Sequence, residues 1–173
     1  ALLVPMLAGE QWAEDVYIES ACMLQAINEE ELGDFAKKLK RETAEQVLDD
    51  AYEVLKTHHI PLFDAAYHRL KTTMPEVPPV RFSNGDLWLE NFIVKDQKLA
   101  AVIDFPNAMF SDPIYEFLLS FFAEPKLQGR GVEERFCQRI GFDPAILHWY
   151  HGLEYFDTLR WVLKTGENFV HHT

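Results

Sequence analysis

The chain has 173 residues, of which 48% are hydrophobic and 25% charged, enough for a globular unit with a buried core. Its 28 acidic and 16 basic residues give a formal net charge of -12, which argues against a nucleic-acid partner and suits cationic small molecules. Two cysteines are too few for a disulfide framework or a four-cysteine zinc site.

Residues 1–10 form a short apolar run that ends in a glycine turn, a pattern that favours a strand. The run has no initiating methionine and no polar lead-in, so we expect the chain to begin inside a larger domain. Residues 12–70 predict two or three helices, because their apolar side chains recur at spacings of three and four. Thr43 and Gln46 have the form of a capping box, and the prolines within residues 75–79 end the helical pattern.

The next segment predicts a hairpin, with strands at residues 92–94 and 99–103 joined by a polar turn. Asp86 and Asn91 come just before the first strand, and Asp104 comes just after the second. Because an antiparallel hairpin returns the chain to its starting end, we expect these three polar side chains to converge.

Two Asp-Pro pairs predict helix starts, with the aspartate as N-cap and the proline in the first turn. Asp112-Pro113 begins a helix over residues 114–122, whose apolar run is interrupted by Glu116 and is too short to span a bilayer. We therefore expect a cytoplasmic protein without a membrane partner. Asp143-Pro144 begins a longer helix that ends near Gly166, with an apolar face made of Ile146, Leu147, Tyr150, Leu153, Leu159 and Val162.

Asp86, Asn91 and Asp104 each have an ordinary structural explanation, as turn or cap residues. Together they offer a carboxylate that can accept a proton and a pair of hard oxygen ligands of the kind that Mg²⁺ prefers. The combination favours a functional site over three unrelated turns.

Residues 84–91 and 102–116 resemble the two motifs of the aminoglycoside phosphotransferase-like small-molecule kinases, which are relatives of the protein-kinase fold. The shared positions are Gly85, Asp86, Leu87, Asn91, Ile103, Asp104, Asp112 and Pro113. The resemblance implies an α+β, mainly α-helical fold: a protein-kinase-like C-terminal lobe in which a short β-hairpin carries the catalytic and metal loops. Residues 1–10 would be a hinge-like strand and residues 11–173 the lobe itself.

The same resemblance implies roles for the three converging residues. Asp86 would be the catalytic aspartate, which orients or accepts the proton of a substrate hydroxyl. Asn91 and Asp104 would hold Mg²⁺, with ATP or GTP as the phosphate donor.

Other residues would have supporting roles. Val4 and Met6 in the hinge would contact the nucleotide, with an ordinary buried strand as the alternative. Asn84 and Asp112 would support the loops, although histidine is usual at the position of Asn84 and an asparagine lacks the ring that packs beneath the catalytic loop.

Glu154 and Asp157 lie on the last predicted helix, and the family's C-terminal helices often border the acceptor site. Both would then bind a cationic group of the substrate. The alternative is that they occupy a solvated helix face.

Residues 1–83 contain neither a glycine-rich loop nor a lysine on an apolar strand. We therefore expect the N-terminal nucleotide lobe to be absent and the isolated chain to be inactive, within a parent kinase that phosphorylates a hydroxyl of an aminoglycoside, amino alcohol or related metabolite. Its partner would be the missing lobe, or a second copy through the exposed hinge strand. Two alternatives are a non-catalytic kinase-like binding module, consistent with Asn84, and a metal-dependent hydrolase.

Overall fold

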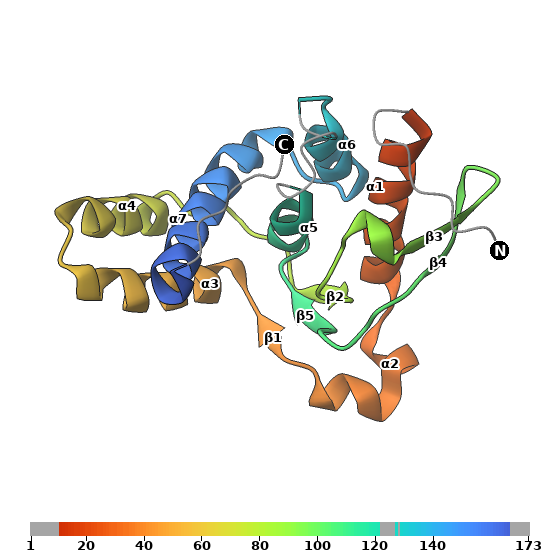
Figure 1. Cartoon of the computed structure of the whole chain (residues 1–173), viewed down its shortest axis with the longest axis horizontal. Helices are drawn as coiled ribbons and strands as arrows, with labels where there is room; N and C mark the ends of the chain where they lie inside the picture. Colours follow the sequence, from red (N-terminus) through yellow and green to blue (C-terminus); the bar gives the residue numbers. More distant parts are fainter. Residues whose placement is uncertain (1–10, 122–126, 128, 167–173) are drawn as a thin grey trace.

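The computed structural model describes residues 11–121, 127 and 129–166, so the expected hinge strand at residues 1–10 lies outside the described residues. Helices pack around a small three-stranded sheet and a separate hairpin (Figure 1). This confirms the predicted α+β, mainly helical class. Within the described residues, none of the helices has the length and apolar character needed to cross a membrane.

Two of the first helices begin with capping boxes that can be recognised in the sequence. The capping box at Thr43 is confirmed, because its hydroxyl accepts from Gln46 N (3.2 Å) while Gln46 Oε1 accepts from Thr43 N (2.8 Å). An equivalent box at Asn28 and Glu31 begins the short second helix. The elements in this region are α1 (Gln11–Ala26), α2 (Glu29–Leu32), the 3₁₀ helix η1 (Gly33–Lys38), β1 (Arg41–Glu42), α3 (Ala44–Leu55), the 3₁₀ turn η2 (Lys56–His58) and α4 (Pro61–Thr72).

The three-stranded sheet has the order β1-β5-β2, with β2 at Arg81–Ser83 and β5 at Met109–Ser111. The central strand β5 runs parallel to β1 and antiparallel to β2, and Phe110 is opposite both Arg41 and Phe82. The short extended segment before the hairpin was predicted from sequence, but the pairing of β1 with β5 was not. These two strands are only two and three residues long, and they are far apart in the chain.

The predicted hairpin is confirmed as β3 (Phe92–Lys95) and β4 (Lys98–Val102), joined by Asp96 and Gln97. Both turn residues have positive φ, 52° and 60°, the backbone of a type I′ turn, whose twist matches that of the flanking strands. A 3₁₀ turn, η3 (Leu89–Asn91), leads into β3.

The C-terminal half contains α5 (Pro113–Phe121), α6 (Val132–Arg139), the 3₁₀ turn η4 (Pro144–Ile146) and α7 (Leu147–Thr165). The long helix predicted after Asp143 is confirmed, with a 3₁₀ turn at its start. Its predicted apolar face is confirmed only in the first half: Leu147, Tyr150 and Leu153 are buried, whereas Leu159 is 43% exposed.

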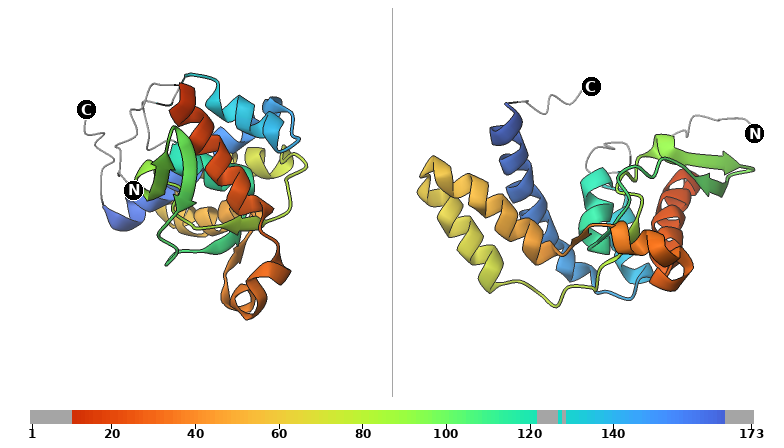
Figure 2. Two further views of the ribbon diagram at one scale, coloured as in Figure 1. Left: turned by 90° about the vertical axis from the view of Figure 1, so that its right-hand side faces the viewer. Right: turned by 90° about the horizontal axis from the view of Figure 1, so that it is seen from below.

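Aromatic side chains join the helices behind the sheet. Phe117 on α5 stacks on Phe136 of α6 at 3.9 Å between ring centroids, and Tyr17 of α1 lies 4.9 Å from Phe117. Helices α3, α4 and α7 lie on one side of α5, and α1, α6 and the hairpin lie on the other (Figures 1 and 2). The sheet and α5 thus form the centre on which the loops bearing Asp86 and Asp104 are mounted.

A buried acid joins α1 to the segment that precedes and includes α6. Glu14 is almost fully buried and pairs with Arg130 and Arg135, and Arg135 Nη1 also donates to Asp15 Oδ1 (2.8 Å). Two guanidinium groups compensate the buried charge of Glu14. Without them, the unpaired carboxylate would destabilise the fold strongly.

Candidate active site

Asn84 is fully buried immediately after β2 and connects the two loops that carry the predicted acids. Its Nδ2 donates to the backbone oxygens of Asp86 (2.9 Å) and Asp104 (3.4 Å). Its Oδ1 accepts from Asp86 N (3.3 Å). A single amide therefore fixes the loop before the hairpin against the loop after it.

Asn91 holds Asp86 from the other side. Its Nδ2 donates to the Asp86 backbone oxygen (2.9 Å) and to Asp86 Oδ2 (3.1 Å). The second oxygen of that carboxylate, Oδ1, makes no hydrogen bond with another described residue. The carboxylate is thus oriented through one oxygen and can accept a proton through the other.

Asp104 lies two residues after the end of β4 and has a left-handed backbone, with φ 65°. The preceding residue, Ile103, still pairs across the hairpin, because its N–H donates to Asn91 O (2.9 Å). Asp104 is therefore held close to Asn91, the residue that orients Asp86. Its carboxylate is exposed and makes no hydrogen bond or ion pair with the described residues. The structure therefore brings the three predicted residues to one end of the hairpin.

The donor set fits a magnesium ion. Asn91 uses its nitrogen for Asp86 and keeps its amide oxygen, and the Asp104 carboxylate is unengaged. No cluster of three or more His, Cys, Asp or Glu side chains in the described ranges could hold a metal by itself. Mg²⁺ is commonly held by one or two protein oxygens together with water and nucleotide phosphates, so two ligands are compatible with it.

Gly85 lets the two loops approach each other closely. It has φ 71°, and a Cβ at this position would lie 2.1 Å from the backbone oxygen of Asn107. Both the backbone conformation and the close contact therefore require glycine.

Glu116 supports this arrangement from α5, a role that was not predicted from the sequence, where Glu116 was noted only as an interruption of an apolar run. Its two carboxylate oxygens accept from Ser83 Oγ (2.9 Å) and Ser111 Oγ (3.2 Å), one on β2 and the other on β5. Ser83 Oγ in turn accepts from Gly85 N (3.0 Å). Burial raises the pKa of Glu116, and the two serine hydroxyls oppose that shift. The sequence signal was an acid inside an otherwise apolar helix.

Asp112 caps α5 as predicted, because its Oδ1 accepts from the backbone N–H groups of Ile114 (2.9 Å) and Tyr115 (3.0 Å). Its Oδ2 accepts from Tyr150 Oη of α7 at 2.7 Å. Burial raises the pKa of Asp112 to about 6, although these three hydrogen bonds oppose the shift. The contact with Tyr150 had no signal in the sequence.

Glu154 and Asp157 do not occupy a solvated helix face, and that alternative was wrong: each is only 6% exposed. Asp157 Oδ2 accepts from Tyr115 Oη (2.8 Å), and its carboxylate pairs with Arg160, with Nε 2.6 Å from Oδ1 but poorly aligned for a hydrogen bond. Glu154 Oε1 accepts from Thr158 (3.1 Å), whereas its Oε2 has no partner among the described residues. Burial raises the pKa of Glu154 to about 7.

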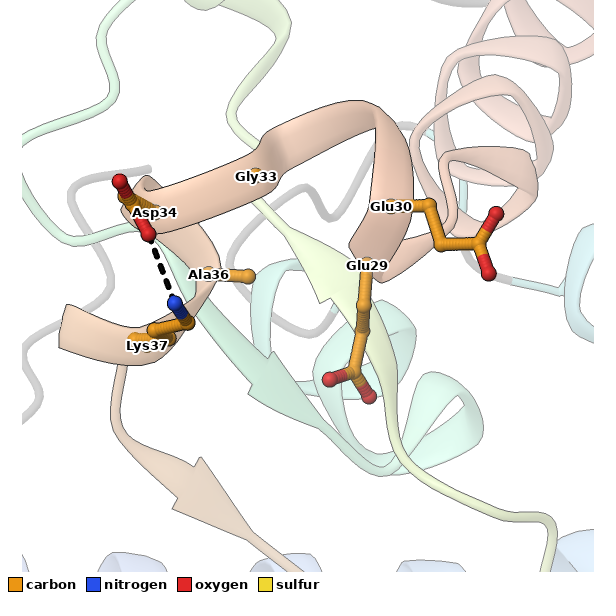
Figure 3. A pocket seen from close by; sticks show the side chains of 6 residues that line it. All are labelled: Glu29, Glu30, Gly33, Asp34, Ala36 and Lys37. Atoms are coloured by element: carbon orange, nitrogen blue, oxygen red, sulfur yellow. Dashed lines mark hydrogen bonds and ion pairs between the residues drawn. The ribbon is translucent and has the colours of Figure 1, made fainter.

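Two concavities in the described part of the chain stand out, and Asp86 lines neither of them. The larger, about 450 Å³, opens on the surface of α2 and η1, where Lys37 pairs with Asp34 (Figure 3). The smaller, about 20 Å³, has room for one water or one ammonium group. It lies between α3, α5 and α7 and is lined by Glu42, Val47, Asp50, Tyr115, Asp157 and Arg160.

The predicted nucleotide contacts Val4 and Met6 lie outside the described residues. Their role remains a prediction from sequence.

Comparison with known proteins was made on sequence and on structure. A family model with the description "Phosphotransferase enzyme family" matches residues 9–160. Among solved structures, a macrolide 2'-phosphotransferase type I superposes with a TM-score of 0.62 at 16% sequence identity, which supports the kinase-like fold. The match covers 92% of this chain and 56% of that one, so the chain spans little more than half of that enzyme. No sequence among the curated proteins matches.

We predict that Gly85→Ala lowers the free energy of unfolding by at least about 2 kcal/mol, because the new methyl group meets Asn107 O in a left-handed backbone. Gly141→Ala is the matched control, since Gly141 also has positive φ (87°) but nothing lies within 4 Å of its Cβ position. It should cost about 1 kcal/mol. Urea unfolding of both variants measures the difference, and equal losses would contradict the close contact.

We predict that Glu154→Gln makes the protein more stable than the wild type above neutral pH. The folded state holds the Glu154 proton more tightly than the unfolded chain, so this group's stabilising contribution is complete below pH 4.5 and is lost as the pH rises through about 7. We expect an advantage of roughly 1 to 2 kcal/mol at pH 8 and little at pH 4.5, after allowing for partial screening.

Urea unfolding at the two pH values tests this expectation. Glu134→Gln, at an exposed position on α6, is the control. A stability difference between Glu154→Gln and wild type that does not change with pH would refute the assignment.

Proposed function

We propose a function that starts from one fact: the chain belongs to the phosphotransferase enzyme family. It would provide the part of an ATP-dependent enzyme that binds the acceptor and the metal, and the enzyme would phosphorylate a hydroxyl of a small molecule. The observation that carries this proposal is the orientation of Asp86 by Asn91, with Asp104 joined to the same loop through Asn84. GTP is the alternative phosphate donor.

Asp86 would act on the acceptor. Its Oδ2 is engaged by Asn91, which leaves Oδ1 to accept the proton of the attacking hydroxyl and to align that oxygen with the phosphate. A positioned base of this kind contributes about 10² to 10⁴ in rate. Most of the remaining acceleration in phosphoryl transfer comes from positioning and from neutralisation of charge.

Asn91 Oδ1 and the Asp104 carboxylate would hold Mg²⁺. The ion would neutralise charge on the nucleotide phosphates and bridge them to the protein. The left-handed backbone of Asp104 and the hydrogen bond between Ile103 N and Asn91 O hold Asn91 and Asp104 at one end of the hairpin. Such preorganisation reduces the ordering that binding requires.

We propose that the acceptor carries a cationic group, which Asp157 and Glu154 attract from α7. Asp157 lines the small cavity together with the acids Glu42 and Asp50 and with its own ion-pair partner Arg160, so the carboxylates there outnumber the cation, and the cavity has room for one ammonium group. Glu154 Oε2 lacks a partner among the described residues one turn earlier on the helix. Macrolides, aminoglycosides and amino alcohols combine such a group with a hydroxyl.

The nucleotide also needs cationic donors, and we propose that they come from outside the described residues, on a separate N-terminal lobe. The lysines at 37, 40, 56 and 71 pair with carboxylates at the surface of the helical region. Val4 and Met6 would contribute the connection to that lobe and the contact with the base.

A non-catalytic binding module is the second candidate, because Asn84 stands where histidine is usual in similar kinases. The observed hydrogen bonds weaken this candidate: the Asn84 amide supports both loops without a ring. The metal-dependent hydrolase has no comparable support, since it would not require Asn91 to orient Asp86.

We predict that Asp86→Asn and Asp104→Asn each lower nucleotide turnover, by about 10² or more for Asp86, while the fold is retained. The experiment uses the longest protein product that contains these 173 residues, with Mg²⁺-ATP and a panel of kanamycin, erythromycin and 2-aminoethanol. Glu30→Gln on α2 is the control for loss of a surface charge. Full turnover in both site variants would refute the proposed function.

We also predict that the 173-residue chain alone shows no nucleotide turnover with the same panel. Four of its described lysines, Lys37, Lys40, Lys56 and Lys71, pair with carboxylates away from the Asp86 loop, so they would not serve as donors to the phosphates. A coupled assay for ADP release measures this directly. Turnover above the level of the Asp86→Asn chain would contradict the proposal that a second lobe is needed.

A further inference from the structure

Trp88 is an exposed aromatic residue two positions after Asp86. Its side chain is 39% exposed and makes no hydrogen bond, ring contact or ion pair with another described residue. A single exposed apolar side chain is common and would need no explanation. The position of Trp88 within the loop makes its exposure informative.

The backbone holds this residue firmly. Trp88 N donates to Asp86 O (2.8 Å), and Trp88 O accepts from Asn91 N (2.9 Å). The preceding residue, Leu87, is buried, and Trp88 has extended dihedral angles (φ -76°, ψ 146°), so consecutive side chains point in opposite directions. The indole is therefore directed away from the core by the same turn that orients the Asp86 carboxylate.

Trp88 also belongs to an apolar rim, by which we mean the exposed large apolar residues within two positions of Asp86 or Asp104 in the chain. Eleven large apolar side chains are exposed among the described residues, and three of them, Trp88, Ile103 and Phe105, lie within two positions of Asp86 or Asp104. A few polar groups surrounded by apolar and aromatic side chains are the usual composition of a small-molecule site. This grouping distinguishes Trp88 from the exposed apolar residues scattered over the helices.

Within the rim, Ile103 and Phe105 flank Asp104, on the proposed metal and phosphate side, and Phe105 already stacks on Phe82 (6.2 Å, 10° between planes). Trp88 lies between Asp86 and Asn91 in the chain, in the tight turn that its own N–H closes onto Asp86 O, next to the proposed base. Its ring has the large area and low flexibility that make tryptophan an effective contact surface.

Resting on the proposed function, we infer that Trp88 is the acceptor-positioning residue: its indole face supports the carbon framework that carries the reacting hydroxyl beside Asp86. The acceptor must then present an apolar or ring face next to that hydroxyl. Water has no such face, so hydrolysis of the nucleotide does not depend on contact with the indole of Trp88.

The test compares Trp88→Ala and Trp88→Phe in the longest protein product that contains the chain. Transfer to kanamycin, erythromycin and 2-aminoethanol is measured against hydrolysis of Mg²⁺-ATP by water. Trp88→Ala should lower kcat/KM for the best acceptor by about 10-fold or more, largely through KM, whereas Trp88→Phe should lower it by only about 2- to 3-fold. Hydrolysis should stay within about 2-fold of wild type in both variants.

The control is Leu62→Ala, which removes an exposed apolar side chain from α4. If the wild type is active and Trp88→Ala leaves kcat/KM unchanged, this inference is overturned while the proposed function stands. An equal loss of transfer and hydrolysis would also overturn it, because the ring would then only support the loop. A wild type with neither activity would overturn the proposed function and this inference with it.

Discussion

The geometry of the site depends on one buried amide. Asn84 Nδ2 donates to the backbone oxygens of both Asp86 and Asp104, and Asn84 Oδ1 accepts from Asp86 N, so the loop before the hairpin and the loop after it share one hydrogen-bonding group. Glu116 bonds to Ser83 and Ser111 on the strands beneath, and Gly85 allows the loops to touch. Without the amide, two backbone carbonyls would each lose a donor, and the loops that carry Asp86 and Asp104 would no longer be bonded to the same side chain.

The interactions that the sequence revealed are local ones. The capping box at Thr43, the helix start at Asp112 and the hairpin that gathers Asp86, Asn91 and Asp104 each follow from residues within a few positions of one another. Such rules concern backbone geometry and fixed reach, which a short segment determines alone. The grouping of the two acids and the amide was therefore predictable, whereas their exact hydrogen bonds were not.

The interactions that the sequence did not reveal are long-range. The pairing of β1 with β5 joins residues 41–42 to residues 110–111, and the contact of Tyr115 with Asp157 joins two helices. Asp157 illustrates the reason: the sequence of one helix shows its neighbour Arg160, but the hydrogen bond from Tyr115 that accompanies its burial comes from 42 residues away. Periodicity describes which face of one helix is apolar, but the second helix decides what that face contacts.

The buried pairing of Glu14 with Arg130 and Arg135 bears on the order in which the chain can fold. These residues are separated by 116 and 121 positions, so their contact forms only after most of the chain has been brought together. The α3–α4 hairpin, by contrast, consists of neighbouring segments and can form early. Until residue 130 is present, α1 cannot bury Glu14 without leaving its charge uncompensated. The final packing of α1, with Glu14 buried, therefore requires that the segment carrying Arg130 and Arg135 is already in place.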